Sequence, residues 1–324
     1  MENATAVLEE ARFCSVFASG QAAINAILQL LDQGDHVLAV RDIDDGAYRQ
    51  FTKVIAALGI SVSFVDTTNL DNIRDGFLPN TKLLWLKSPN IPQVSITDIV
   101  GSAALAKERG VISVVDSTFA SPYLQNPLAL GADLVIHSNI KYIAGYSGVP
   151  FGLVLTNDLD TYERLRSYQN TIGAKPNPQE CLQVLSGLKT LGVRMERHCF
   201  NTLAVAKFLE SHPRIARVHY PGLVNDPGYE IAKKQMRAFG AIISFELRGT
   251  FVDARSLLTR LRLFVIAEGL RDVKSLIYHR MSITHGAVEP EISSEAGIAD
   301  GLIRASIGLE DFEDLIDDLK DALG

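Results

Sequence analysis

The sequence predicts an α/β protein with a doubly wound, mostly parallel sheet and a smaller C-terminal α+β part. Helix-like and strand-like segments alternate through the first half of the chain, which is the pattern of a parallel sheet with helices on both faces. The strand-like segments are short apolar runs rich in branched residues, as expected for strands buried on both sides. From about residue 160 the pattern becomes helical and then mixed.

Each expected element follows from its own periodicity and flanking residues. In the first half we expect helices at 19–31, 46–59 and 96–110, and strands at 36–40, 61–66, 81–89, 111–118 and 132–138. In the second half we expect helices at 158–169, 179–212 and 311–323, and strands at 240–249 and 302–308. The change of pattern predicts a large domain at residues 1–192 and a small C-terminal domain at residues 193–324.

Composition and charge describe an ordinary globular enzyme. Hydrophobic residues make up 47% of the 324 residues, and the net charge of −7 offers no attraction for nucleic acid. No apolar run could span a membrane, and the polar start has neither signal nor transit character. Three cysteines without CxxC spacing fit reduced thiols, and the seven histidines lack metal-site spacing. We expect a cytoplasmic protein that acts on a small molecule and binds no metal, nucleic acid or membrane.

A single lysine follows an apolar run in the middle of the chain. Residues 131–138 are rich in branched side chains, the run ends at Ser138, and Lys141 stands between Ile140 and Tyr142. A lysine at the carboxyl end of a buried strand can lie in a low dielectric, where its pKa falls and its neutral amine can attack a carbonyl group. The alternative is a loop lysine with a packed stem and its ammonium group in water.

Two further segments bear on this lysine. The apolar run 111–119 contains Asp116, and an acid at a strand end either is a solvated cap or holds a cationic ring nitrogen. Ser19-Gly20-Gln21 opens an apolar-periodic helix, whose first N–H groups and positive dipole end suit a phosphate. A Schiff-base lysine, an acid for a ring nitrogen and a phosphate cradle together describe a site for pyridoxal 5′-phosphate (PLP).

The segment VVDSTFASPYLQNPLALGADLVIHSNIKY, residues 114–142, resembles the signature of the PLP-dependent Cys/Met-metabolism enzymes. These include cystathionine γ-synthase, the cystathionine lyases, methionine γ-lyase and the homoserine sulfhydrylases. The resemblance runs almost from end to end of the chain. It implies fold type I of the PLP-dependent transferases (aspartate-aminotransferase-like), a small amino-acid substrate and a homodimer or homotetramer. The implied reaction is elimination or replacement of a substituent on a sulfur-containing or γ-substituted amino acid.

The resemblance also assigns roles to individual residues. Lys141 would form the Schiff base and move protons on the substrate, and Asp116 would pair with the pyridine nitrogen. Arg304 would bind the substrate carboxylate through its guanidinium fork. The other residues expected to bind the cofactor are Ser19, Gly20, Gln21, Asn90 and Ser138.

The sharpest departure from the family pattern is Asp44, which stands where the family has a tyrosine that stacks on the cofactor ring. A carboxylate at that position cannot stack, but it could hydrogen-bond or act as a base, so we expect Asp44 to be catalytic together with Lys141. The alternative is that Asp44 caps the helix expected to begin near Gly46, a position for which aspartate is favoured.

Other departures surround the site. The family's cofactor-contacting asparagine falls on Ile91, with Asn90 adjacent, and Ile140 replaces a threonine that contacts the phosphate. Gly269, which we expect at the substrate, and the following Arg271 replace a serine and a small loop. The family's N-terminal arm, which lends a phosphate-binding arginine to the neighbouring subunit, has no counterpart, so a partner could supply it. Losing the Ile140 hydroxyl and that arginine would cost about 3–6 kcal/mol, which predicts weaker PLP binding than in the family.

Two alternatives remain open beside the PLP-dependent carbon–sulfur lyase or γ-synthase-type transferase. The chain could be a pseudoenzyme that keeps the fold and a partner surface without turnover. It could also be a specialised biosynthetic enzyme whose altered pocket accepts an unusual substrate. The retained Lys141, Asp116 and Arg304 favour an enzyme.

Overall fold

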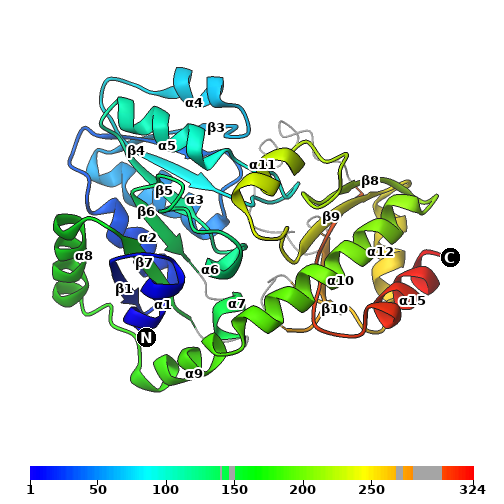
Figure 1. The fold of residues 1–324 in the computed structure, drawn as a ribbon. Helices are drawn as coiled ribbons and strands as arrows, with labels where there is room; N and C mark the ends of the chain where they lie inside the picture. Colours follow the sequence, from blue (N-terminus) through cyan, green and yellow to red (C-terminus); the bar gives the residue numbers. More distant parts are fainter. Residues whose placement is uncertain (139–140, 146–149, 268–272, 280–300) are drawn as a thin grey trace.

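Two sheets and one long helix organise the structure, a computed structural model. Figure 1 shows a seven-stranded sheet with its helices at one end, a five-stranded sheet at the other, and helix α10 (Leu191–Ser211) extending from one to the other. Among the described residues no helix is both long and apolar enough to cross a membrane. Of Lys141 only the backbone is described; the residues described are 1–138, 141–145, 150–267, 273–279 and 301–324.

The seven-stranded sheet has the order β1-β7-β6-β5-β4-β2-β3. Neighbours from β3 to β6 run parallel, and β7 is antiparallel to both β6 and β1. The five strands expected in the first half are confirmed; β1 and β7 are not predicted, because a short apolar run has no periodicity that separates it from a helix segment. The bounds are β1 Phe13–Phe17, β2 His36–Val40, β3 Ser61–Val65, β4 Thr81–Lys87, β5 Ile112–Asp116, β6 Leu134–His137 and β7 Gly152–Thr156.

Helices cover both faces of this sheet, as the alternating pattern predicts. One face packs against the helices α2 (Gly20–Leu28), α3 (Asp45–Arg49) and α8 (Leu159–Ile172). The other face packs against α1 (Glu2–Leu8), α4 (Leu70–Gly76), α5 (Ile99–Glu108) and α9 (Pro178–Leu188). The short helices α6 (Ser121–Leu124) and α7 (Lys141–Ala144) follow β5 and β6.

The chain leaves the adjacent strands β2 and β4 toward opposite faces of the sheet. After β2, residues of α3 join the core on one face, whereas after β4 residues of α5 join the core on the other. Such a change of direction is a topological switch point, and ligands of doubly wound sheets bind in the crevice that it leaves at the carboxyl ends of the strands.

The helix expected at 46–59 is interrupted. It divides into α3, a π-helical turn η1 (Gln50–Val54) and a 3₁₀ turn η2 (Ala56–Leu58), and Gly59 ends it with φ +79°. The β-branched residues Thr52, Val54 and Ile55 weaken α-helical propensity in this stretch. The turn that ends the helix requires the left-handed conformation that glycine adopts at low cost.

The second sheet has the order β10-β11-β12-β9-β8 and is covered on one face by α10, α12 and α15. The expected strands at 240–249 and 302–308 and the expected final helix are confirmed. The elements are β8 Ile215–His219, α11 Tyr229–Gln235, β9 Ile242–Leu247, α12 Phe251–Arg260, β10 Val265–Ile266, β11 Leu276–His279, β12 Leu302–Ser306 and α15 Phe312–Leu323.

The segment expected as one helix at 179–212 forms two, α9 and α10, with a break at Lys189 and Thr190. The expected domain boundary at residue 192 falls in the first turn of α10. Because α10 contributes to the core of the five-stranded sheet, this boundary agrees with the packing of that helix, but it stays a prediction.

A hydrogen bond from His198 connects α10 to Ile307, the residue that follows β12. His198 donates from its Nδ1–H to the carbonyl oxygen of Ile307 at 2.7 Å, and its Nε2 is buried without a hydrogen-bond partner among the described residues. Burial, with a smaller contribution from the nearby Arg194 charge, lowers the pKa of His198 to about 4 from an ordinary 6.5. The imidazole is therefore neutral in the folded protein.

This burial predicts a loss of stability in mild acid. The unfolded chain binds a proton at His198 below pH 6.5, whereas the folded chain resists until about pH 4, so the free energy of unfolding falls as the pH drops through this window. The loss from this one group is on the order of 3 kcal/mol. We expect His198→Gln to be less stable at pH 7.5 but to depend less on pH between 6.5 and 4.5, as measured by urea unfolding. The control variant His212→Gln changes a partly exposed histidine, and its free energy of unfolding should depend on pH as in the wild type. If His198→Gln also shows the wild-type dependence on pH, the assignment to His198 is contradicted.

Candidate active site

The site expected from the sequence lies at one edge of the seven-stranded sheet. Because β2, β4, β5 and β6 are parallel neighbours, their carboxyl ends meet there. Asp44 follows β2, Lys87 ends β4, Asp116 ends β5 and Ser138 follows β6. Asp44, Asp116 and Ser138, which the sequence predicts as site residues, therefore lie at the same end of the sheet. Lys87, which the sequence analysis does not predict, lies there too.

Asp116 is a buried carboxylate held by hydroxyl groups. Its Oδ1 accepts from the backbone N–H of Thr118 at 3.0 Å and from the Thr118 hydroxyl, and its Oδ2 accepts from Ser138 Oγ at 3.4 Å. The Thr118 hydroxyl also accepts from the backbone N–H of Ser138 at 2.9 Å. Asp116, Thr118 and Ser138 therefore form one network that orients the carboxylate.

The first turn of α2 approaches the backbone of Ser138. A Cβ atom on Gly20 would lie 1.2 Å from the Ser138 carbonyl oxygen, so only glycine permits this contact. Ser19 caps the helix, since its Oγ accepts from the backbone N–H of Ala22 at 3.1 Å. Gly20 and Gln21 are the first residues of the helix, so their N–H groups have no partner within it. The first N–H groups of α2 therefore lie beside Ser138, whose hydroxyl donates to Asp116.

The Gln21 side chain serves a different purpose from its backbone. Gln50 Nε2 donates to the Gln21 carbonyl oxygen at 2.8 Å and to Gln21 Oε1 at 2.7 Å. A Cβ atom on Gly46 would lie 2.3 Å from Gln21 Nε2, so the side chain also lies against α3. It ties α2 to the segment that follows Asp44.

Lys141 begins α7, a four-residue helix that is anchored by Arg194 of α10. Arg194 donates to the carbonyl oxygens of Tyr142 at 2.5 Å, Ile143 at 3.4 Å and Gly187 at 2.8 Å. A helix this short leaves its last carbonyl groups without intrahelical partners, and a buried guanidinium satisfies several of them at once. The Lys141 backbone is thereby fixed to α10.

Arg304 lies on the other sheet but is linked to α7. The Tyr142 hydroxyl and Ser306 Oγ are 3.3 Å apart, and residues 304 and 306 share a face of β12. The guanidinium of Arg304 lies 4.7 Å from the centre of the Tyr278 ring on the neighbouring strand β11. The expected carboxylate-binding arginine is thus held on the same side of its strand as the residue that contacts the helix of Lys141.

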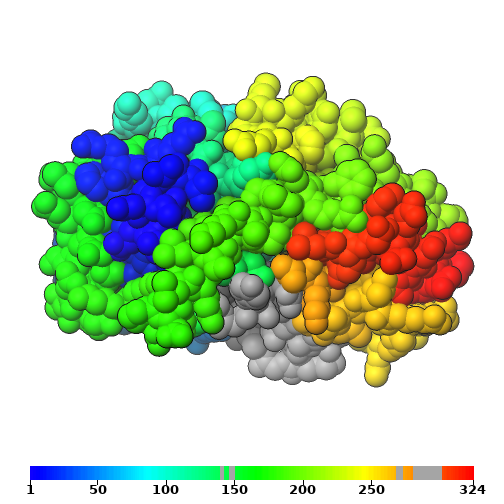
Figure 2. Space-filling model, turned by 60° about the horizontal axis from the view of Figure 1, so that its bottom comes forward, coloured from blue at the N-terminus to red at the C-terminus, as the bar shows by residue number. Residues whose placement is uncertain are grey.

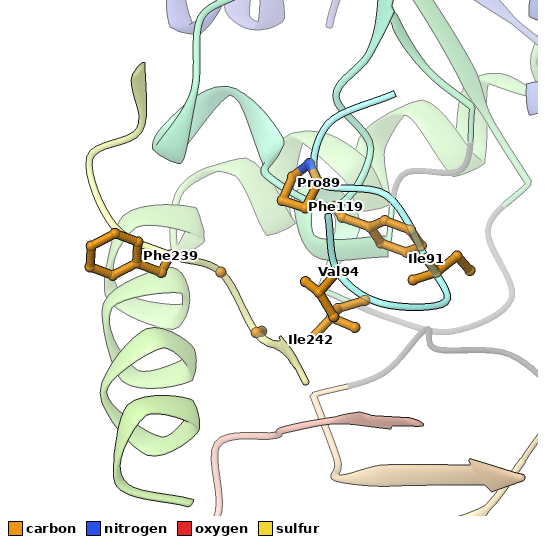
Figure 3. Close-up of a pocket in the computed structure, with 8 residues that line it drawn as sticks. Pro89, Ile91, Val94, Phe119, Phe239 and Ile242 are labelled. Atoms are coloured by element: carbon orange, nitrogen blue, oxygen red, sulfur yellow. The ribbon is translucent and has the colours of Figure 1, made fainter. Parts of the chain in front are cut away.

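Asn90 and Ile91 differ in their surroundings. Asn90 is buried, its backbone pairs with Ser95, and its Oδ1 has no hydrogen-bond partner among the residues that the structure describes. Ile91 lines a cavity of about 10 Å³ with Val94, Phe119 and Ile242, which Figure 3 shows between the loop 89–94 and the segment 239–242. That volume holds at most about one water, so Ile91 belongs to the apolar contact between the two parts of the chain.

Asp44 forms an ion pair rather than a helix cap. It precedes α3, but its side chain makes no capping hydrogen bond to that helix. Its Oδ2 instead accepts from Lys87 Nζ at 2.7 Å. The Lys87 ammonium also lies 4.9 Å from the centre of the Phe119 ring.

The comparison with known proteins decides the family. The whole chain, residues 1–324, matches the family described as Cys/Met metabolism PLP-dependent enzyme. The chain belongs to this family. Its members depend on PLP, so the resemblance noted in residues 114–142 is confirmed.

Individual relatives are similar over nearly the whole chain. Cystathionine gamma-lyase of Dictyostelium discoideum is 44% identical over 322 residues, which cover 99% of this chain and 83% of that protein. Cystathionine beta-lyase of Coxiella burnetii is 44% identical over 324 residues, covering 99% and 84%. The crystal structure of metB from Corynebacterium glutamicum has a TM-score of 0.93 at 41% identity, covering 98% of this chain and 82% of that one. The fold is therefore fold type I of the PLP-dependent enzymes, as predicted.

The described residues fit PLP. A buried carboxylate, Asp116, suits the protonated ring nitrogen, and the N–H groups at the start of α2 suit the phosphate. The glycine at position 20 lets the first turn of α2 lie against the Ser138 backbone, and Asn90 Oδ1, which has no hydrogen-bond partner within the described part of the chain, lies in the loop after β4. The structure brings Ser19, Gly20, Gln21, Asp116 and Ser138 to one place, and their contacts with the cofactor stay a prediction.

Three residues of the site are not predicted from the sequence. Lys87 gives a signal, since it is a charge at the end of an apolar strand run, and Thr118 gives a weaker one as a hydroxyl two residues after the acid. Arg194 gives none, because it acts on Tyr142, which lies 52 residues away in the chain. Ile140, Gly269 and Arg271 lie outside the described residues, as does the side chain of Lys141.

The contact between Gly20 and Ser138 predicts the effect of one added methyl group. Gly20→Ala would force α2 and β6 apart, because the new Cβ would meet a backbone carbonyl rather than a flexible side chain. We expect at least a tenfold weaker affinity for PLP, followed by absorbance during titration, and a lower melting temperature.

Gly101→Ala is the matched control. Gly101 also lies in the first turn of a helix, α5, but its added methyl group would meet the ends of the Leu70 and Asp98 side chains, which can move. PLP affinity should stay unchanged in this variant. If Gly20→Ala binds PLP as tightly as Gly101→Ala does, the start of α2 is not the phosphate site.

Proposed function

We propose that this protein is a PLP-dependent carbon–sulfur lyase that acts on a sulfur-containing or γ-substituted amino acid. The observation that supports the proposal is the meeting of Asp116, Ser138 and the first turn of α2 at the carboxyl ends of the parallel strands. The helix that begins at Lys141 follows the same strand β6, and its Tyr142 contacts Ser306, two residues after Arg304. The relatives support the proposal, since two are named as lyases of cystathionine, a thioether that joins two amino acids. They do not favour the alternatives of a pseudoenzyme or a specialised biosynthetic enzyme.

Each residue has a defined role in this proposal. When bound, PLP supplies an electron sink for the negative charge that develops at the substrate Cα. Asp116 holds a proton on the ring nitrogen, and Thr118 and Ser138 hold the Asp116 carboxylate in place. The N–H groups of Gly20 and Gln21 bind the phosphate.

Lys141 would hold the cofactor and move protons on the substrate. Its amine takes the proton from the substrate Cα and returns protons as the side-chain substituent leaves. Arg194 and Tyr142 position the helix that begins at Lys141, and Arg304 binds the substrate carboxylate. A gamma-lyase and a beta-lyase are equally similar to the chain at 44% identity, so the products distinguish elimination at Cγ from elimination at Cβ.

We also propose that the protein is a homo-oligomer of at least two chains. Large apolar side chains are exposed on α1, α9 and α10, namely Val7 at 77%, Leu182 at 65% and Val193 at 73%. The helices α1 and α9 contribute to one hydrophobic cluster, and Figure 2 shows the N-terminal residues beside the green residues of α9 and α10 on one face. A second copy would cover this face. The cytoplasmic location stays a prediction.

Product analysis tests the proposed reaction. With PLP-loaded protein and cystathionine, elimination at Cγ releases cysteine, 2-oxobutanoate and ammonia, whereas elimination at Cβ releases homocysteine, pyruvate and ammonia. We expect one of these sets, with a free thiol in equal amount to the keto acid. Lys141→Ala should lower the rate by at least about a thousandfold, because it removes the proton-transferring amine. Borohydride reduction followed by peptide mapping should place the pyridoxyl group on Lys141; a label on Lys87, or no thiol from any cystathionine-like thioether, would overturn the assignment.

Light scattering tests the assembly. At about 10 μM we expect a mass of at least twice the 35.4 kDa of one chain. Val193→Glu places a charge in the exposed apolar face and should shift the mass toward the monomer. Val224→Glu, at a residue that is equally exposed at 75% but lies just after β8, should not. A wild-type protein that is monomeric at this concentration would contradict the proposal.

A further inference from the structure

The ion pair between Lys87 and Asp44 is buried at its positive end. The Lys87 side chain is 1% exposed and the Asp44 side chain 43%, although Lys87 Nζ and Asp44 Oδ2 are only 2.7 Å apart. The ammonium also lies 4.9 Å from the centre of the Phe119 ring. Because a buried ammonium has lost its hydration, it needs a carboxylate as a partner.

A second carboxylate stands beside this cation. Lys87 at the end of β4 is the register partner of Asp116 at the end of β5, so both side chains leave the sheet on the same face, about 5 Å apart at the backbone. A lysine has a flexible four-carbon stem, so a change of rotamer would bring its ammonium to Asp116 instead of Asp44. In the structure Asp116 accepts hydrogen bonds from Thr118 and Ser138, which are neutral donors.

Stability alone gives a poor account of the pair. A buried ion pair is often no more stable than apolar residues of similar volume, because both charges lose hydration. Nor does Asp44 cap the helix that it precedes, whereas Asp98 and Asp158 cap theirs in this chain. The carboxylate of Asp44 is instead directed to Lys87, at the carboxyl ends of the strands where a doubly wound sheet binds its ligand.

The partner that Lys87 takes matters for the cofactor. In the proposed function Asp116 holds the protonated ring nitrogen, and a carboxylate that already pairs with an ammonium attracts a second cation less strongly. The positive charge of Lys87 and the two negative charges of Asp44 and Asp116 leave one negative charge, as Asp116 alone would. Asp44 therefore cancels the charge of a lysine that would otherwise compete with the ring nitrogen.

We propose that Asp44 is a positioning residue that holds the Lys87 ammonium away from Asp116 and so leaves the Asp116 carboxylate to the ring nitrogen of the cofactor. This inference rests on the proposed function. It gives Asp44 a role that differs from the catalytic one expected from the sequence, because Asp44 acts through Lys87 and moves no proton itself. The Phe119 ring beside the ammonium helps to keep Lys87 in this orientation.

The test compares PLP with 1-deazapyridoxal 5′-phosphate, in which a carbon atom replaces the ring nitrogen. Both compounds carry the aldehyde and the phosphate, so the ratio of their affinities isolates the interaction of Asp116 with the ring nitrogen. Equilibrium dialysis against cofactor-free protein gives both affinities without reference to activity. We expect the wild type to bind PLP about tenfold or more tightly than the analogue, the change expected for one hydrogen bond between charged groups.

The isosteric change Asp44→Asn should reduce this ratio to about one, because the uncompensated Lys87 ammonium then pairs with Asp116. Lys87→Met should keep the native ratio, and so should the double variant, because no ammonium then competes for Asp116. Damage to the site would weaken both compounds alike, and a second substitution would not reverse it. The matched control is Asp45→Asn, an exposed acid one residue along the chain, which should also keep the native ratio.

Several results would overturn the inference. If Asp44→Asn keeps the native ratio, or the double variant does not restore it, Asp44 does not act through Lys87; the lyase proposal still stands where the wild type releases a thiol from cystathionine. A wild type without preference for PLP over the analogue overturns the inference in the same way. If the wild type binds neither compound and releases no thiol, the inference falls together with the proposed function. If Asp44→Asn does not fold, Lys87→Met decides, since a lower ratio there would show that Lys87 supports Asp116 instead of competing for it.

Discussion

The site depends on the contact between the backbone of Gly20 and the carbonyl group of Ser138. This contact joins the first turn of α2, on one face of the sheet, to the end of β6 in its middle, and a Cβ atom would lie 1.2 Å from the oxygen. Because both partners are backbone groups, no change of rotamer could relieve the steric clash that a larger side chain at position 20 would cause. The contact holds the first N–H groups of α2 beside Ser138, whose hydroxyl in turn donates to the carboxylate of Asp116.

The second constraint is the placement of α7. A helix of four residues is not stable by itself, so tertiary contacts decide where Lys141 lies. Arg194 bonds the carbonyl groups at its end, and Gly187 of α9 approaches so closely that a Cβ atom would lie 2.1 Å from the Ala144 carbonyl oxygen. Through Tyr142 the same helix reaches Ser306. The lysine is thus fixed by both α9 and α10, and these connect the large sheet to the strand of the substrate-binding candidate Arg304.

The ion pair of Asp44 and Lys87 is the third constraint on the site. Asp44 stands where an aromatic ring is expected, and a carboxylate there would repel the negative phosphate and ring oxygens if it were alone. Lys87 compensates its charge, so the edge of the site keeps a balance of charge while it gains a polar group at the surface. The role of Asp44 is therefore understood only together with Lys87.

The sequence by itself determined the elements whose signals are local. The strands at 36–40, 61–65 and 112–116 are visible as apolar runs, and Asp116, Ser138 and the start of α2 are visible as polar residues at the ends of such elements. Tertiary structure decided the features that depend on partners far along the chain. These are the antiparallel strand β7 and the break of the helix at 46–59. They also include the Asp44–Lys87 ion pair, whose members are 43 residues apart in the sequence, and the Arg194–Tyr142 hydrogen bond, whose members are 52 apart. Periodicity reports only which face of a segment is apolar, whereas a pair of charges or a cap is decided by which segments the sheet order brings together.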